Sequence, residues 1–94
     1  MGERSALRVQ IEGRVQGIGY RYWLIEQAAS LGLDGWVRNR RDGRVEAVVS
    51  GPQEALDEIL RRCHEGPSLA RVDRVAAEAE TAKVEPGFHA LPTV

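Results

Sequence analysis

The sequence from Gly13 to Arg21 reads Gly-Arg-Val-Gln-Gly-Ile-Gly-Tyr-Arg, and it joins a strand pattern to a helix pattern. Before it, apolar and polar residues alternate over 7–12, as in a half-buried strand. The stretch itself holds three glycines and ends in an arginine. A short glycine-rich loop can turn several backbone N–H groups toward one point, and a helix that starts there adds positive potential. The loop could therefore bind a phosphate-sized anion, with Arg21 as a permanent positive charge.

Composition predicts one domain that spans residues 1–94, of which residues 1–5 are expected to be flexible. The apolar fraction of 43% and the charged fraction of 29% are those of soluble globular proteins. No apolar run approaches the length of a membrane span. The net charge of −1 argues against a nucleic-acid partner, although residues 1–44 carry +3 and the remainder −4. The single cysteine, Cys63, allows no intrachain disulfide, and a reducing cytoplasm is the expected location.

Alternating and helical patterns predict the remaining elements. They are a strand over 7–12, a helix over 20–31, strands over 35–39 and 44–50, a helix between 52 and 66, and a strand that alternates cleanly over 75–80. A short final strand over 88–91 could form at an edge of the sheet. Asp42-Gly43 predicts a hairpin turn in which both residues tolerate positive φ. A shift of apolar phase between Val72 and Val75 indicates a bulge or a late strand start.

Each predicted helix carries an apolar stripe that should face the sheet. In the first helix the stripe consists of Tyr22, Ile25, Ala28 and Ala29, with Leu24 and Leu31 as further candidates. In the second helix it consists of Ala55, Leu56, Ile59, Leu60 and Cys63. Gly32 is the expected C-cap of the first helix, and Pro52 the expected first residue of the second.

The order β-α-β-β-α-β predicts an α+β fold. It is a split βαβ (ferredoxin-like) sandwich, with an antiparallel sheet and two helices on one face. Right-handed crossovers make the first two strands parallel, with the third strand between them. Their C-terminal ends then lie about 10 Å apart at the same edge of the sheet. Because the glycine loop follows the first strand and Asn39 ends the second, we expect both to face one cavity.

The residue types alone leave the role of this loop open. Gly17-Ile18-Gly19 lacks the third glycine of a dinucleotide-binding fingerprint, and no Gly-Lys-Ser/Thr sequence is present. Glycine is also common in ordinary turns, so the loop could be purely structural. Asn39 could likewise simply precede a turn. Arg21, however, opposes the dipole of a first helical turn, which favours an anion-binding role.

Two long blocks of the sequence resemble the acylphosphatase family. One is the stretch 13–21, and the other is Gly35-Trp36-Val37-Arg38-Asn39-Arg40-Arg41-Asp42-Gly43-Arg44-Val45-Glu46. Gly51-Pro52 and Gly66-Pro67-Ser68-Leu69-Ala70-Arg71-Val72 follow in the expected order. The resemblance covers nearly the whole chain, and the last residues, 88–94, depart most from the family's usual ending.

The resemblance implies a hydrolase that splits acyl phosphates into a carboxylate and inorganic phosphate, with no metal and no cofactor. Arg21 matches the family's phosphate-binding arginine, and Asn39 matches the asparagine that positions the attacking water. Backbone N–H groups of the phosphate-binding loop would hold the phosphoryl oxygens together with Arg21. This loop consists of Val15, Gln16, Gly17, Ile18, Gly19 and Tyr20. The expected partners are small-molecule acyl phosphates and acyl-phosphorylated proteins, with no nucleic acid and no membrane, and the expected state is a monomer.

Other functions stay open on the sequence. A non-catalytic domain of the same fold could bind an anion or a protein without turnover. An RNA-binding sheet fits the strand order but lacks stacking aromatics on its central strands. An acylphosphatase-like domain of a carbamoyl-transferring maturation protein is a further alternative. The physiological substrate is not specified, and broad specificity is expected. The arginines within 38–44 could be solvated or could steer anionic substrates.

Overall fold

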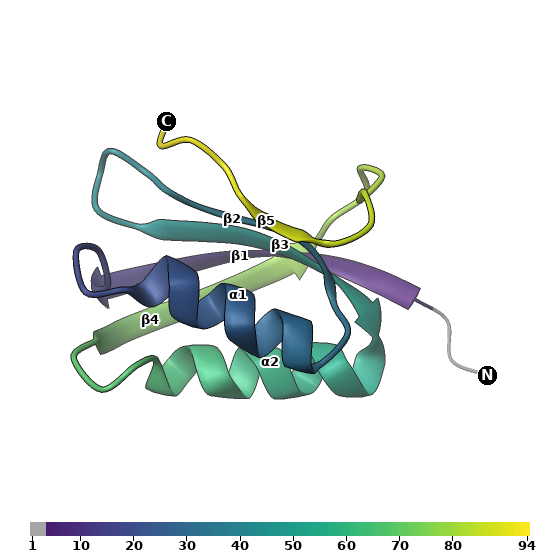
Figure 1. The fold of residues 1–94 in the computed structure, drawn as a ribbon, viewed down its shortest axis with the longest axis horizontal. Helices are drawn as coiled ribbons and strands as arrows, with labels where there is room; N and C mark the ends of the chain where they lie inside the picture. The colour runs from purple at the N-terminus through teal and green to yellow at the C-terminus, as the bar shows by residue number, and fades with distance from the viewer. Residues whose placement is uncertain (1–3) are drawn as a thin grey trace.

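The computed structural model describes residues 4–94 as a five-stranded sheet with two helices on one face (Figure 1). The elements are β1 (Arg4–Arg14), α1 (Tyr20–Ser30), β2 (Asp34–Asn39), β3 (Val45–Pro52), α2 (Gln53–Glu65), β4 (Arg71–Ala79) and β5 (Phe88–Ala90). This is the predicted split βαβ order, and the fifth strand forms. Within the segment 1–5, for which flexibility is expected, Arg4 and Ser5 pair with β3, and residues 1–3 lie outside the described part.

The strand order in the sheet is β4-β1-β3-β2-β5. As predicted, β3 is antiparallel to both β1 and β2, so these two strands run parallel on either side of it. β5 pairs parallel to β2, which makes the sheet mixed rather than wholly antiparallel. The path of the chain explains this difference. β4 ends where the Glu80 N–H donates to the Ala6 carbonyl, and the chain reaches the start of β2 where the Gly87 N–H donates to Asp34. It therefore enters β5 in the direction of β2.

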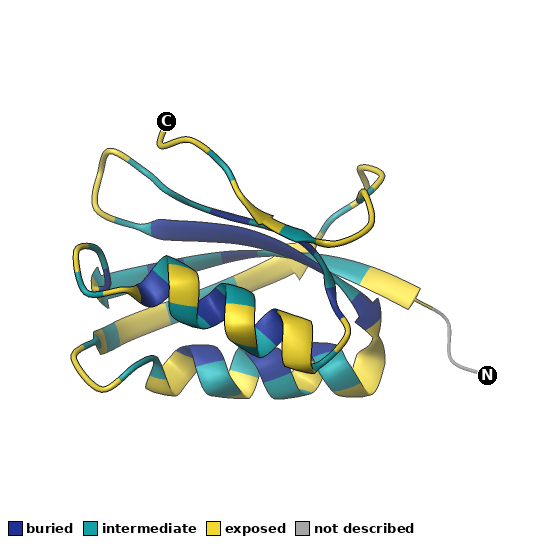
Figure 2. Ribbon diagram, in the orientation of Figure 1, coloured by how far each residue is buried: buried dark blue, intermediate teal, exposed yellow. Residues whose placement is uncertain are grey.

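The core lies between the sheet and the helices, and Figure 2 shows the buried residues along β3 and the inner helix faces. In α1 the buried residues are Tyr20, Leu24 and Ala28. The predicted stripe is therefore wrong for Tyr22 and Ala29, which are exposed. Tyr20 sets the helix phase, because its ring is buried and its hydroxyl donates to the Cys63 carbonyl at 2.8 Å. Residues four apart share a helical face, so the row from Tyr20 to Ala28 turns inward.

The stripe predicted for α2 is confirmed, since Leu56, Ile59 and Cys63 are buried and Ala55 and Leu60 pack against them. Pro52 lies one position earlier than expected, because it ends β3 and forms the N-cap of α2.

The end of α1 is a Schellman motif. The Leu33 N–H donates to the Ala28 carbonyl at 2.9 Å and the Gly32 N–H to the Ala29 carbonyl at 3.1 Å. Gly32 takes the left-handed conformation just beyond the C-cap, which is Leu31. In the β2–β3 hairpin only Gly43 has a positive φ; Asp42 instead accepts the Arg44 N–H at 3.1 Å.

The outer strand β4 contains the predicted bulge. Glu12 pairs with Arg74 and Gly13 with Val72, so Asp73 is the additional residue. Val75 is half-buried, but Ala77 and Ala79, which alternate with it, are exposed. These alanines are small and lie on an edge strand, which has a neighbouring strand on one side only.

Glu46 organises the face of the sheet opposite the helices. It is 5% exposed, and its carboxylate accepts hydrogen bonds from Arg38 at 2.9 Å, Gln10 at 2.8 Å and Arg8 at 2.9 Å. The guanidinium groups of Arg8 and Arg38 also stack on the Trp36 ring. Burial by itself raises the pKa of Glu46, but the hydrogen bonds from Arg38, Gln10 and Arg8 outweigh it and lower the pKa to about 2.

Replacing the Glu46 carboxylate should make the free energy of unfolding less sensitive to pH in the acidic range. Glu46→Gln leaves Arg8 and Arg38 without their shared charge, so the free energy of unfolding at neutral pH should fall by about 2 kcal/mol. The wild-type contribution is complete above the ordinary glutamate pKa of 4.5 and is lost as pH falls toward 2. Urea unfolding of both proteins across this range measures the difference, which should shrink with falling pH. Glu58, whose pKa is also lowered, is common to both proteins and cancels. A constant difference would contradict the assignment.

Candidate active site

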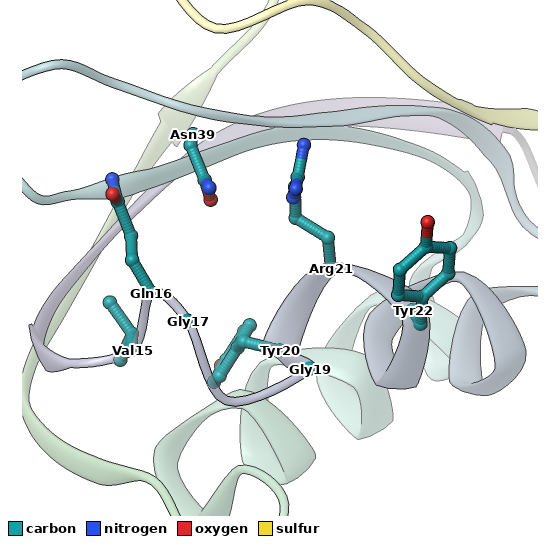
Figure 3. A pocket seen from close by; sticks show the side chains of 8 residues that line it. All are labelled: Val15, Gln16, Gly17, Gly19, Tyr20, Arg21, Tyr22 and Asn39. Carbon is teal, nitrogen blue, oxygen red and sulfur yellow. The ribbon is translucent and has the colours of Figure 1, made fainter.

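A cavity of about 220 Å³ opens where β1 and β2 end, as the strand order predicts (Figure 3). The loop after β1 and the first turn of α1 form one side, and Asn39 at the end of β2 forms the other. The residues that line it are Val15, Gln16, Gly17, Gly19, Tyr20, Arg21, Tyr22 and Asn39. Every predicted site residue except Ile18 therefore lies at this cavity. The side chain of Ile18 packs against the core instead.

The glycines of the opening stretch have two different structural roles. Gly17 and Gly19 have φ of 76° and 84°, a region that only glycine adopts readily, and open space surrounds the position of a Cβ at both. Gly13 belongs to β1, and a Cβ there would collide with the Arg71 carbonyl of β4. The loop therefore needs Gly17 and Gly19 for its own conformation, whereas Gly13 permits close strand packing.

The backbone of this loop offers free hydrogen-bond donors to the cavity region. The chain turns at residues 16–19, but within residues 4–94 no N–H group of residues 16–20 donates a hydrogen bond of good geometry to a protein acceptor. The first helical bond of α1 is that of the Trp23 N–H to the Gly19 carbonyl at 3.0 Å. A helix start with unused N–H groups carries positive potential, which suits an anion.

Arg21 lies in the first turn of α1, and its side chain points into the space that Asn39 also faces (Figure 3). That helical turn contains no acidic residue, and in the described part of the chain Arg21 makes no ion pair. Arg41 makes no ion pair within residues 4–94 but does not line the cavity. Three other arginines near the hairpin have acidic partners: Arg38 and Arg40 pair with Glu46, and Arg44 pairs with Asp42. Their charges are thus engaged, so Arg21 presents the uncompensated cation of this cavity.

Asn39 carries a polar atom that the fold leaves unsatisfied. Its side-chain Oδ1 is buried and, within residues 4–94, has no hydrogen-bond partner. Buried polar atoms nearly always have a partner, and leaving one without costs about 1–3 kcal/mol. The amide projects from the end of β2 toward the phosphate-binding loop and Arg21 (Figure 3). It is therefore placed to accept a hydrogen bond from a molecule in the cavity.

Gln16 connects the phosphate-binding loop to the β2–β3 hairpin, a role that the sequence does not reveal. Its Nε2 donates to the backbone carbonyls of Arg40 at 2.7 Å and Arg44 at 2.8 Å. The side-chain amide thus holds the loop against the segment that follows Asn39. Tyr22 was also missed as a cavity residue, because helical periodicity places it in the buried stripe.

The chain is similar to known proteins over nearly its whole length. The acylphosphatase family model matches residues 7–90. An acylphosphatase of Rhizorhabdus wittichii is 49% identical over 92 residues, which cover 98% of this chain and 93% of the relative. One of Nitrobacter hamburgensis is 51% identical, with 93% and 94% covered. The solved acylphosphatase structure of Coxiella burnetii superposes with a TM-score of 0.90 at 30% identity and covers 94% of this chain and 93% of that one.

The fold is a ferredoxin-like α+β sandwich, and its cavity places a glycine-rich loop opposite the buried amide of Asn39. The chain belongs to the acylphosphatase family, and it is a hydrolase of acyl phosphates. No helix in the part of the chain that the structure describes is long and apolar enough to span a membrane.

Removing the Gln16 side chain should loosen the loop without unfolding the protein. Gln16→Ala loses both bonds to the hairpin, so we expect unfolding to become easier by about 1 kcal/mol and phosphate affinity to fall about fivefold. Calorimetric titration with inorganic phosphate and amide hydrogen exchange of residues 16–20 measure the two effects. Gln53→Ala is the matched control, because Gln53 donates to Asp57 on the exposed side of α2 and should leave phosphate binding unchanged. Equal phosphate affinity in both variants would disprove the bracing role.

Proposed function

We propose that Arg21, Asn39 and the loop of residues 15–20 carry out the hydrolysis of acyl phosphates by direct attack of water on phosphorus. The observation that carries this proposal is the pairing of an uncompensated arginine with an unsatisfied buried amide oxygen across one cavity. The arginine would bind the negatively charged oxygens of a phosphoryl group, and the amide oxygen would accept a hydrogen bond from a water molecule.

Arg21 and the loop bind the phosphoryl group. The guanidinium donates to its oxygens, and the free N–H groups of residues 16–20 add donors from the opposite side. The charge of these oxygens redistributes in the transition state, and donors already in place stabilise it without reorganisation. Gly17 and Gly19 keep the approach open, because no atom lies within 4 Å of their Cβ positions.

Asn39 orients the nucleophile. Its Oδ1 accepts a hydrogen bond from water and directs a water lone pair at phosphorus. An amide does not ionise near neutral pH, so Asn39 is not a general base. A new P–O bond forms to the water, the P–O bond to the acyl group breaks, and its electron pair leaves with the carboxylate. The proton of the water passes to a phosphoryl oxygen, which gives inorganic phosphate.

The proposal extends to the state and location of the protein. It includes a monomer that acts on diffusing acyl phosphates. The cavity opens at the sheet edge, so the acyl phosphate of a modified protein is a second substrate class to test. The only cysteine, Cys63, is free and buried, which fits a reducing cytoplasm.

Variants of the two residues should separate binding from chemistry. Arg21→Ala removes phosphoryl charge stabilisation, so kcat/KM should fall about 10³-fold and the inhibition constant of phosphate should rise more than about tenfold. Asn39→Ala should lower kcat about 10²-fold and leave phosphate inhibition within about twofold. Both are measured with benzoyl phosphate in the presence of a chelator, with Arg74→Ala on exposed β4 as the control.

The free energy of unfolding tests the role of Asn39 independently of kinetics. Because its buried Oδ1 has no partner among residues 4–94, Asn39→Ala should not destabilise the fold, and it should raise the free energy of unfolding by up to about 1 kcal/mol. Urea unfolding of both proteins measures this difference.

If the wild-type protein binds phosphate without hydrolysing any acyl phosphate, the chain is an anion-binding domain and the catalytic proposal fails.

A further inference from the structure

Tyr22 is the one exposed aromatic ring at the cavity within residues 4–94. It is 73% exposed, although it lies in α1 next to Arg21, and it lines the cavity. Single exposed apolar residues are ordinary on a protein surface, as Leu69 at 72% exposure illustrates. Tyr22 differs because its position coincides with the site. The fold gives its ring no core contacts, since Tyr20, Leu24 and Ala28 form the buried row of this helix.

Tyr20, the other aromatic residue at the cavity, has no free ring surface for a ligand to contact. Tyr20 is 1% exposed, and its hydroxyl is committed to the Cys63 carbonyl at 2.8 Å. Its ring also packs edge-on against Trp23 with the centroids 5.2 Å apart. Tyr20 therefore belongs to the core, and the free aromatic surface at the cavity belongs to Tyr22.

The geometry of the reaction indicates which part of a substrate meets this ring. In phosphoryl transfer the attacking and leaving oxygens lie roughly in line through phosphorus. With water held by Asn39, the acyl group points away from Asn39. Figure 3 shows Tyr22 beside Arg21, on the side of Arg21 that faces away from Gln16 and Asn39. In the proposed mechanism the loop and Arg21 hold the phosphoryl group and Asn39 holds the water, so Tyr22 lies on the side toward which the acyl group would point.

We infer that Tyr22 is a specificity-determining residue, which contacts the acyl group and favours acyl phosphates with flat aromatic acyl groups over those with small aliphatic ones. The inference rests on the proposed function of the site. An aromatic acyl group offers a ring that can pack on the tyrosine ring, and such pairs contribute beyond the area they bury. The methyl group of an acetyl phosphate is too small to cover the ring.

Kinetics with two substrates test the inference. In Tyr22→Ala, kcat/KM for benzoyl phosphate should fall about five- to tenfold, mainly through a higher KM, whereas kcat/KM for acetyl phosphate should change less than about twofold. The inhibition constant of inorganic phosphate should stay constant, because Tyr22 does not touch the phosphoryl group. Tyr22→Phe keeps the ring and should retain the wild-type preference.

Two controls distinguish specificity from a structural effect. Leu69→Ala removes an equally exposed apolar side chain away from the cavity and should alter neither substrate. Tyr22→Gln removes the ring but keeps a long side chain that suits a helix, so it repeats the test if the alanine variant unfolds.

The outcomes separate this inference from the proposed function. An equal loss on both substrates, or no loss on benzoyl phosphate, overturns the role of Tyr22 while the hydrolytic mechanism stands. A wild-type protein that hydrolyses neither substrate overturns the proposed function, and the inference fails with it. A loss confined to benzoyl phosphate, with wild-type behaviour in Tyr22→Phe, supports the acyl contact.

Discussion

The active site depends on one constraint, which is that β3 pairs between β1 and β2 and is antiparallel to both. This pairing makes β1 and β2 point the same way, so the segments that follow them emerge at one edge of the sheet. The phosphate-binding loop leaves β1 there, and Asn39 ends β2 there. If just one of these two pairings were parallel instead, β1 and β2 would end at opposite edges of the sheet. Gln16 reinforces the arrangement, because it bonds the loop directly to the hairpin between β2 and β3.

The distribution of charge separates the parts of the molecule that hold the fold from those that act. On the face of the sheet opposite the helices, the buried Glu46 carboxylate accepts hydrogen bonds from Arg8, Arg38 and Gln10. Its negative charge is therefore balanced by the two arginines. At the cavity the opposite holds within residues 4–94: Arg21 lacks a counter-charge and Asn39 Oδ1 lacks a donor. Proteins commonly concentrate unsatisfied groups where a ligand completes them, and stability is lower in proportion. In the proposed function, the substrate supplies the interactions that the fold leaves unmade at Arg21 and Asn39.

Local patterns predicted some features well and failed at others for identifiable reasons. The bulge near Val72 and the inward stripe of α2 follow from residue periodicity, and both are present. The stripe of α1 is wrong at Tyr22 and Ala29, because Tyr20 is anchored by a hydrogen bond to Cys63, a residue of the other helix. The parallel direction of β5 was not predicted, because it depends on the path of residues 80–87 across the sheet edge. Each failure involves a contact between distant segments.

The sequence by itself determined the order of the elements and the two blocks that mark the family, and these blocks made Arg21 and Asn39 the candidate chemical groups of the site. These properties are local, since they depend on periodicity, turn residues and motif spacing. The tertiary structure alone decided which polar groups have partners. It left Asn39 Oδ1 buried without one, engaged Arg38 and Arg40 with Glu46, bound Gln16 to the hairpin and turned Tyr22 outward beside Arg21. The physical reason is that burial and hydrogen bonding depend on neighbours that only the folded chain brings together.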